Sequence, residues 1–252
     1  MSHAGARVTL SRRRTRGREV VGDGSGDGRT LTKPVQSALK KGVDKALMVQ
    51  QPVILKHIRR MTRNRPEAPP AATVRALEKH YMSAVSTTGA AVGGTAAVPG
   101  VGTKVAAALS VGEVATFLEA SALLSLAVAE IHGITIDEVE RRRTLLLAVL
   151  LGDSGVKVIE KTAQRTGQHW GRKITSQVSM ETIRRLNGVL GRNFVTKYGT
   201  KQGIIVIGRL APFGIGAAIG GGGNAFLGSG VVASTRRAFG PPPLELPQHL
   251  KP

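Results

Sequence analysis

The stretch GAAVGGTAAVPGVG, residues 89–102, contains five glycines, four alanines and no charged side chain. A second stretch, GAAIGGGGNAFLGSG at residues 216–230, begins with nearly the same six residues. Small residues recur at every fourth position in both stretches, which places them on one face of a helix. The residues of this predicted helix-packing seam are Gly89, Gly93, Ala97, Gly216, Gly220, Asn224 and Gly228. Such a face lets two helix backbones approach closely, so we expect each stretch to receive a partner helix.

A phosphate-binding loop is the first alternative reading of the earlier stretch, which continues as PGVGTK through Gly100, Gly102 and Lys104. A P-loop needs a glycine immediately before the lysine, a serine or threonine immediately after it, and a strand leading in. Here Thr103 precedes the lysine, Val105 follows it, and the pattern leading in is helical. We therefore expect no nucleotide site and no cofactor at this position.

Helical periodicity runs through most of the chain. Val35, Leu39, Val43 and Leu47 recur about every four residues, and Pro52 is expected to kink or split the helix that they begin. No segment shows sustained alternation of apolar and polar residues, and GIIVIG at 203–208 is the only plausible strand. The sequence predicts an all-α fold, a multi-helix bundle with two Gly/Ala-rich, closely packed helical segments.

Composition divides the chain into four predicted regions. Residues 1–31 form a basic segment, rich in Gly, Arg and Asp, that we expect to be disordered. Residues 32–65 form an amphipathic basic helical region, and residues 70–240 form the main helical domain. Residues 241–252 form a proline-rich tail.

The chain is strongly basic, with 36 Lys and Arg against 16 Asp and Glu and a net charge of +20. Such a cation favours anionic lipid, nucleic acid or acidic proteins. The residues expected to contact anionic lipid are Arg12, Arg13, Arg14, Lys40, Lys41, Arg59 and Arg60. Nucleic acid is not the expected partner, because few aromatic residues are present for base stacking and Arg141–Arg143 occupy successive helical positions that point in different directions.

Two charge-free runs, 81–103 and 210–235, are long enough to cross a bilayer. Glycine and hydroxyl residues make both runs weakly hydrophobic, and the more apolar segment at 117–131 is interrupted by Glu119 and Glu130. Marginal insertion and peripheral attachment to the membrane both stay open at this point.

Few residues offer catalytic or metal-binding chemistry. There is no cysteine, which excludes disulfides, Cys-ligated metals and a thiol nucleophile. The six histidines include no HExxH and no Glu-x-x-His pattern, so we expect no metal. Glu119 and Glu130 lie eleven residues apart, on one helix face, and such a carboxylate face is the alternative that would make the protein an enzyme.

Three segments together resemble the EcsC protein family: GAAVGGTAAVPGVG, AVAEIHGITIDEVERRRTLLLAVLLG and APFGIGAAIGGGGNAFLGSGVVASTRRAFG. The resemblance covers roughly residues 70–240. It implies a bacterial, helical, membrane-associated protein linked to transport or envelope processes, with no catalytic residues to carry over.

We therefore expect a binding or accessory protein on the cytoplasmic side of a membrane, not an enzyme. Its expected partners are an anionic lipid surface and a membrane protein, and the sequence leaves its oligomeric state open. A non-specific nucleic-acid-binding accessory protein is the remaining alternative.

Overall fold

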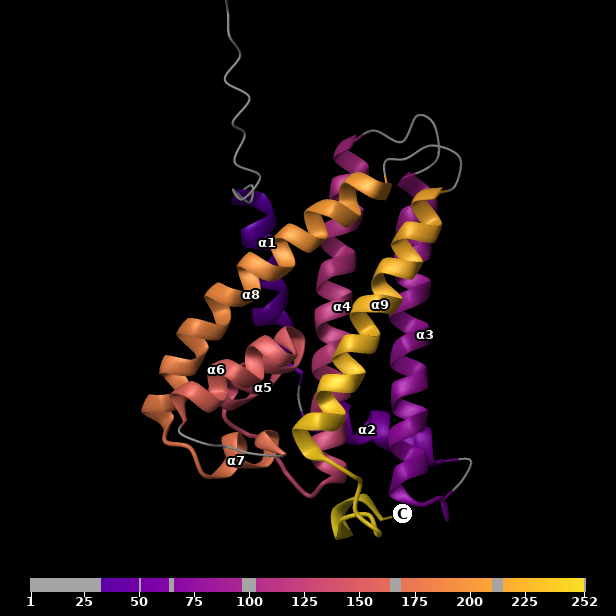
Figure 1. Ribbon diagram of the computed structural model, residues 1–252. Coiled ribbons are helices and arrows are strands. Elements are labelled where there is room, and N and C mark those ends of the chain that lie inside the picture. Colours follow the sequence, from indigo (N-terminus) through magenta and orange to yellow (C-terminus); the bar gives the residue numbers. More distant parts are fainter. Residues whose placement is uncertain are drawn as a thin grey trace, which may run out of the picture. The chain divides into compact units, whose positions relative to one another are not determined.

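The computed structural model describes residues 33–49, 51–63, 66–96, 103–163, 169–209 and 215–251. All regular structure in these ranges is helical, which confirms the all-α bundle (Figure 1). The helices are α1 (Lys33–Leu47), α2 (Gln51–Thr62), α3 (Pro70–Ala96), α4 (Thr103–Ile131), α5 (Val139–Leu151), α6 (Asp153–Thr162), α7 (Trp170–Ser176), α8 (Met180–Arg209) and α9 (Ile215–Phe239), followed by a 3-10 turn, η1 (Gln248–Leu250).

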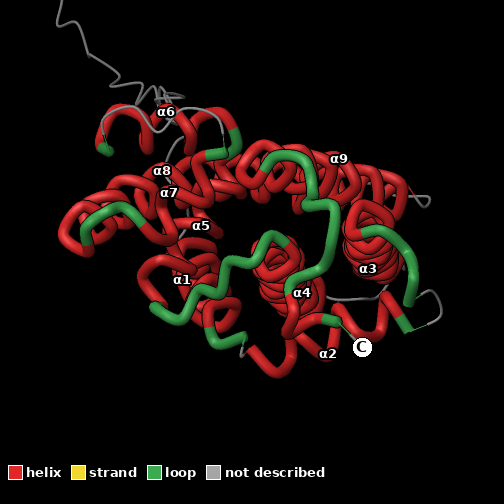
Figure 2. Tube along the Cα trace, turned by 90° about the horizontal axis from the view of Figure 1, so that it is seen from below, coloured by secondary structure: helices red, strands yellow, loops and turns green. Residues whose placement is uncertain are grey.

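Helix α4 forms the centre of the helical body. It contacts α1, α2, α3, α5 and α9, and Figure 2 shows it between α1 and α3. Within the described residues, one stretch, Gly112–Ile131 of α4, is long and apolar enough to cross a membrane, and 67% of its apolar window is buried among the other helices. A helix that is apolar on all sides is also what the centre of a bundle requires. The charge-free runs 81–103 and 210–235 both extend outside the described ranges.

Proline and glycine set several helix ends where the sequence places them. Pro52 lies in the first turn of α2, and the chain is split there from α1, because a proline in a helix interior would remove a backbone hydrogen bond. Gly133 ends α4 with a positive φ of 73°. Its N–H donates to the carbonyl of Glu130 and the N–H of Ile134 donates to the carbonyl of Ala129, which is a Schellman motif.

The most extensive contact between two described helices joins α3 to α9, which lie side by side and antiparallel (Figure 1). At Gly228 on α9 an added Cβ would lie 3.0 Å from Val85 Cγ2 and 3.1 Å from Met82 Sδ, so this glycine is part of a close approach to α3. Gly89 is buried on α3.

The rest of the predicted seam is less completely described. Ala97 lies outside the described residues, and the packing around Gly93, Gly216 and Gly220 lies outside what the structure describes. At these positions the seam stays a prediction.

The stretch 203–208, the only plausible strand in the sequence, lies inside α8 and is helical, in agreement with the all-α prediction. Two other segments pack more closely on the bundle than the four predicted regions suggest. Helices α1 and α2 pack on α4, so the predicted basic region shares one core with the main helical domain. The proline-rich segment at 241–252 does not extend away as a tail: Leu250 is buried and η1 contacts α2. Helical periodicity is local, whereas these contacts depend on which surfaces the other helices leave open.

Candidate functional site

Helix α2 buries one side against the bundle and presents a basic side to solvent. Ile54 and Ile58 are buried, because they recur at helical spacing and face α3 and α4. The opposite side carries four exposed cations, here called the basic face of α2: Lys56, Arg59, Arg60 and, in the turn after the helix, Arg63. No acidic residue occurs between Leu47 and Pro66.

The cations of the basic face of α2 make no ion pair with any described residue. By contrast, Lys45 Nζ on α1 lies 2.7 Å from Glu119 Oε1. Four positive charges within three helical turns, without an ion-pair partner among the described residues, give this surface a positive potential.

The predicted lipid-contact residues fall on three parts of the chain. Arg59 and Arg60 belong to the basic face of α2. Lys40 and Lys41 on α1, before the Pro52 break, are exposed and make no ion pair with a described residue. Arg12, Arg13 and Arg14 lie outside the described residues. The structure therefore places two of the predicted cations on one helix face and adds Lys56 and Arg63, which the sequence analysis did not single out.

Exposed apolar side chains flank the basic face of α2 at its beginning. Met48, in the link from α1, is 72% exposed, and Val53, in the first turn of α2, is 51% exposed. Exposed large apolar residues are rare in the described chain, and a methionine beside a valine at a helix start is able to contact the acyl region of a lipid. The remaining exposed large apolar residues are Val139, Phe226 and Leu244, on other elements.

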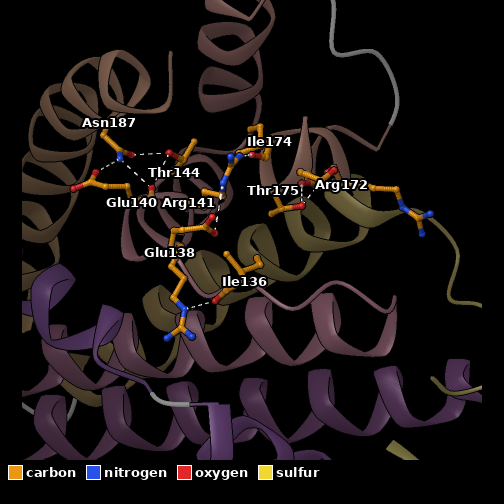
Figure 3. A network of polar contacts seen from close by, with 12 residues as sticks. Ile136, Glu138, Glu140, Arg141, Thr144, Arg172, Ile174, Thr175 and Asn187 are labelled. Carbon is orange, nitrogen blue, oxygen red and sulfur yellow. Dashed lines mark hydrogen bonds and ion pairs between the residues drawn. The ribbon is translucent and has the colours of Figure 1, made fainter. Parts of the chain in front are cut away.

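Arg141–Arg143 point in three directions, as their successive positions on α5 predict. Arg141 Nη1 donates to the carbonyl of Ile174 at 2.6 Å (Figure 3), and Arg142 donates to the carbonyls of Ile136 and Val49, each at 2.6 Å. Arg143 forms an ion pair with Asp44 at 2.9 Å. Two of these three guanidinium groups donate to backbone carbonyls near helix ends, and the third pairs with an acid. The three arginines therefore stabilise the fold and do not form a shared surface for contacting nucleic acid.

A polar network joins α5 to α8 beside these arginines (Figure 3). The Asn187 side-chain amide donates to Glu140 Oε2 at 2.6 Å and to the Glu140 carbonyl at 3.0 Å. The Thr144 hydroxyl donates to Asn187 Oδ1 at 2.8 Å. Because the amide and the hydroxyl are matched with partners, this network is a clamp between helices and not an open site.

Glu119 and Glu130 lie on the side of α4 that faces α1 and α2, as their spacing predicts. They do not form a catalytic pair, since eleven residues of helix separate them by about 16 Å along the axis. Glu119 pairs with Lys45, whereas Glu130 is 3% exposed and lies 3.0 Å from His249 Nε2. The Thr135 hydroxyl also donates to Glu130, at 3.2 Å. His249 lies in the segment predicted to be a proline-rich tail, so its contact with Glu130 was not predicted from the sequence.

A buried amide–carboxylate contact links three helices. Asn224 on α9 donates to Glu113 Oε1 on α4 at 2.7 Å and to the Val85 carbonyl on α3 at 3.1 Å. Asn224 is 2% exposed and Glu113 is 4% exposed. The sequence analysis treated Asn224 only as a small residue of the seam; its amide in an otherwise apolar run was the signal that it joins helices by hydrogen bonds.

No group of three His, Asp or Glu side chains in the described residues is placed to hold a metal ion. Two histidines do come together: the rings of His57 on α2 and His80 on α3 have centroids 5.3 Å apart. Burial lowers the pKa of His57, and the neighbouring His80 and Arg60 lower it further. These two residues form a contact between α2 and α3 just behind the basic face of α2.

Comparisons of the chain with protein-family models, with curated proteins and with solved structures found no match. The likeness to the EcsC family stays a prediction from the three quoted segments.

Proposed function

We propose that this protein attaches peripherally to an anionic membrane surface through the basic face of α2 and acts there by binding, as an accessory protein without a reaction of its own. One observation carries the proposal: four exposed cations on α2 and in the turn after it make no ion pair with a described residue, and residues 48–65 contain no acid. Met48 and Val53 add apolar contact at the start of the same helix.

The expected attachment is weak and sensitive to salt. Each Lys or Arg near an anionic leaflet contributes about 1 kcal/mol, so the four cations contribute about 4 kcal/mol, which corresponds to about millimolar affinity without further contacts. Lys40 and Lys41 extend the positive charge along α1. At physiological ionic strength the attraction falls off over about 8 Å, so high salt should release the protein.

The proposal also fits a position on the cytoplasmic side of a membrane, because that leaflet carries the anionic lipids. The resemblance to the EcsC family supports the same location. From that resemblance the proposal also includes a membrane-protein partner involved in transport or envelope processes.

Vesicle flotation tests it. The protein is floated with vesicles of phosphatidylserine and phosphatidylcholine, and with phosphatidylcholine alone. Arg59→Glu/Arg60→Glu should abolish flotation with the anionic vesicles. The matched control, Arg172→Glu/Arg184→Glu, makes the same change in net charge at exposed positions of α7 and α8 and should leave most of the flotation intact.

Three outcomes would contradict the proposal. Equal loss in both double variants would assign the binding to net charge and not to α2. Retention through high-salt and alkaline carbonate washes would indicate inserted helices. No flotation of the unaltered protein would remove the membrane from its function.

A further inference from the structure

A cavity of about 600 Å³ opens at the end of the bundle where α3 begins and where α4 and α9 end. Its size falls within the usual range for small-molecule sites, about 300–1,000 Å³. Apolar side chains such as Val74 and Val128 line part of it, and Pro241 and Pro242 after α9 form another part of its wall. The charged residues around it are Arg75, Glu78, Arg236 and Arg237, and the histidines are His132 and His169.

On the polar side of the cavity, the buried carboxylate of Glu78 holds the guanidinium group of Arg236. Arg236 Nε donates to Glu78 Oε1 at 2.7 Å and its Nη2 donates to Oε2 at 2.5 Å. The Glu78 side chain is 9% exposed, whereas that of Arg236 is 62% exposed. A two-point contact of this kind orients the guanidinium plane. It leaves Nη1 of Arg236 with no hydrogen bond to a described residue.

The cavity carries an excess of positive charge. Arg75, one turn before Glu78 on α3, is exposed and has no ion pair with a described residue. Arg237 lies 3.1 Å from Asp153, which is not part of the cavity lining. Arg236 is paired with Glu78 and Arg237 with Asp153, so with neutral histidines the charge of Arg75 is the one in the described lining that no acid balances. An anion is the complementary ligand.

Two histidines line the wall of the cavity. His169 has a φ of 62°, the only positive φ of a non-glycine residue in the described chain. Its exposed ring lies next to Gly240, so a Cβ added at that glycine would lie 2.2 Å from His169 Cε1 and would displace the ring. His132 Nδ1 donates to the Val128 carbonyl at 2.8 Å, and this hydrogen bond orients the imidazole of His132.

From this arrangement we infer that the cavity binds an organic anion with an apolar body. Its carboxylate or phosphate group contacts Arg75 and the free Nη1 of Arg236, and its apolar part lies against Val74, Pro241 and Pro242. This site is separate from the basic face of α2, and it needs no membrane.

Isothermal titration calorimetry of the full chain, without vesicles, tests the inference. Decanoate and decyl phosphate are the probes, with decanol as the uncharged control and inorganic phosphate as the control without an apolar body. Either charged probe should bind more tightly than both controls, and the better of the two identifies the head group. Arg75→Gln should weaken that binding about five- to tenfold, because it removes one charge-assisted contact.

Two further variants keep the test decisive. Ala71→Leu fills the cavity without changing its charge and should also weaken binding, whereas Arg184→Gln on α8 removes an equal charge elsewhere and should not. The inference is wrong if decanol binds as tightly as the better of the two charged probes, if Arg75→Gln and Arg184→Gln have equal effects, or if neither charged probe binds. The Arg59→Glu/Arg60→Glu variant should bind the probe normally, so this result and the membrane result are independent.

Discussion

Replacing Gly228 by alanine should reveal how closely α9 approaches α3. The new Cβ would lie 3.0 Å from Val85 Cγ2, 3.1 Å from Met82 Sδ and 3.4 Å from Tyr81 Cε1. Overpacking of this kind typically costs about 1–3 kcal/mol. Alanine also gains about 1 kcal/mol over glycine in a helix interior, so the net loss of unfolding free energy is expected between about 0 and 2 kcal/mol.

Gly230→Ala is the matched control, since Gly230 is exposed two residues later on α9 and an added Cβ there would meet no atom within 4 Å. It should raise the unfolding free energy by about 1 kcal/mol, because only the helix propensity changes. The two alanine variants should therefore differ by about 1–3 kcal/mol, or several degrees in Tm. Urea and thermal unfolding measure both.

A double-mutant cycle assigns the difference to the contact itself. Met82→Ala removes the sulfur next to Gly228, so Gly228→Ala should be less harmful in that background by about 0.5 kcal/mol or more. If Gly228→Ala stabilises the protein as much as Gly230→Ala does, the helices do not approach closely at this position and the reasoning about the seam fails.

Three other predictions address the fold around the sites. Arg142→Ala removes the donor to two backbone carbonyls and should lower the unfolding free energy by about 2 kcal/mol or more in urea titrations. The pKa of His57 in the folded protein is lowered from its usual value of 6.5, so the unfolded chain binds this proton more tightly. The unfolding free energy should therefore fall as the pH drops from about 6.5 toward the lower pKa of the folded state, and it should fall less in His57→Gln in urea titrations at several pH values. Removing residues 241–252 exposes the site of Leu250 and the buried carboxylate of Glu130, and should lower the Tm by several degrees in a thermal scan.

The candidate site was partly predictable. Arg59 and Arg60 stood out as neighbouring cations on an amphipathic helix, and both are exposed. The absence of acidic residues close to them in sequence was equally predictable, because none occurs between Leu47 and Pro66. The Glu78–Arg236 pair was not predictable, since its members are separated by 158 positions and only the antiparallel packing of α3 on α9 brings them together.

The sequence alone determined that this protein is helical and where several of its helices end. Each of these features depends on residues within one or two turns: the apolar spacing, Pro52 as a break and Gly133 as a cap. The tertiary structure decided which helix faces are covered, so it separated Glu119 from Glu130 and joined His249 to Glu130 across the bundle. Such pairings depend on how distant apolar faces pack together, and a local sequence pattern does not specify its distant partner.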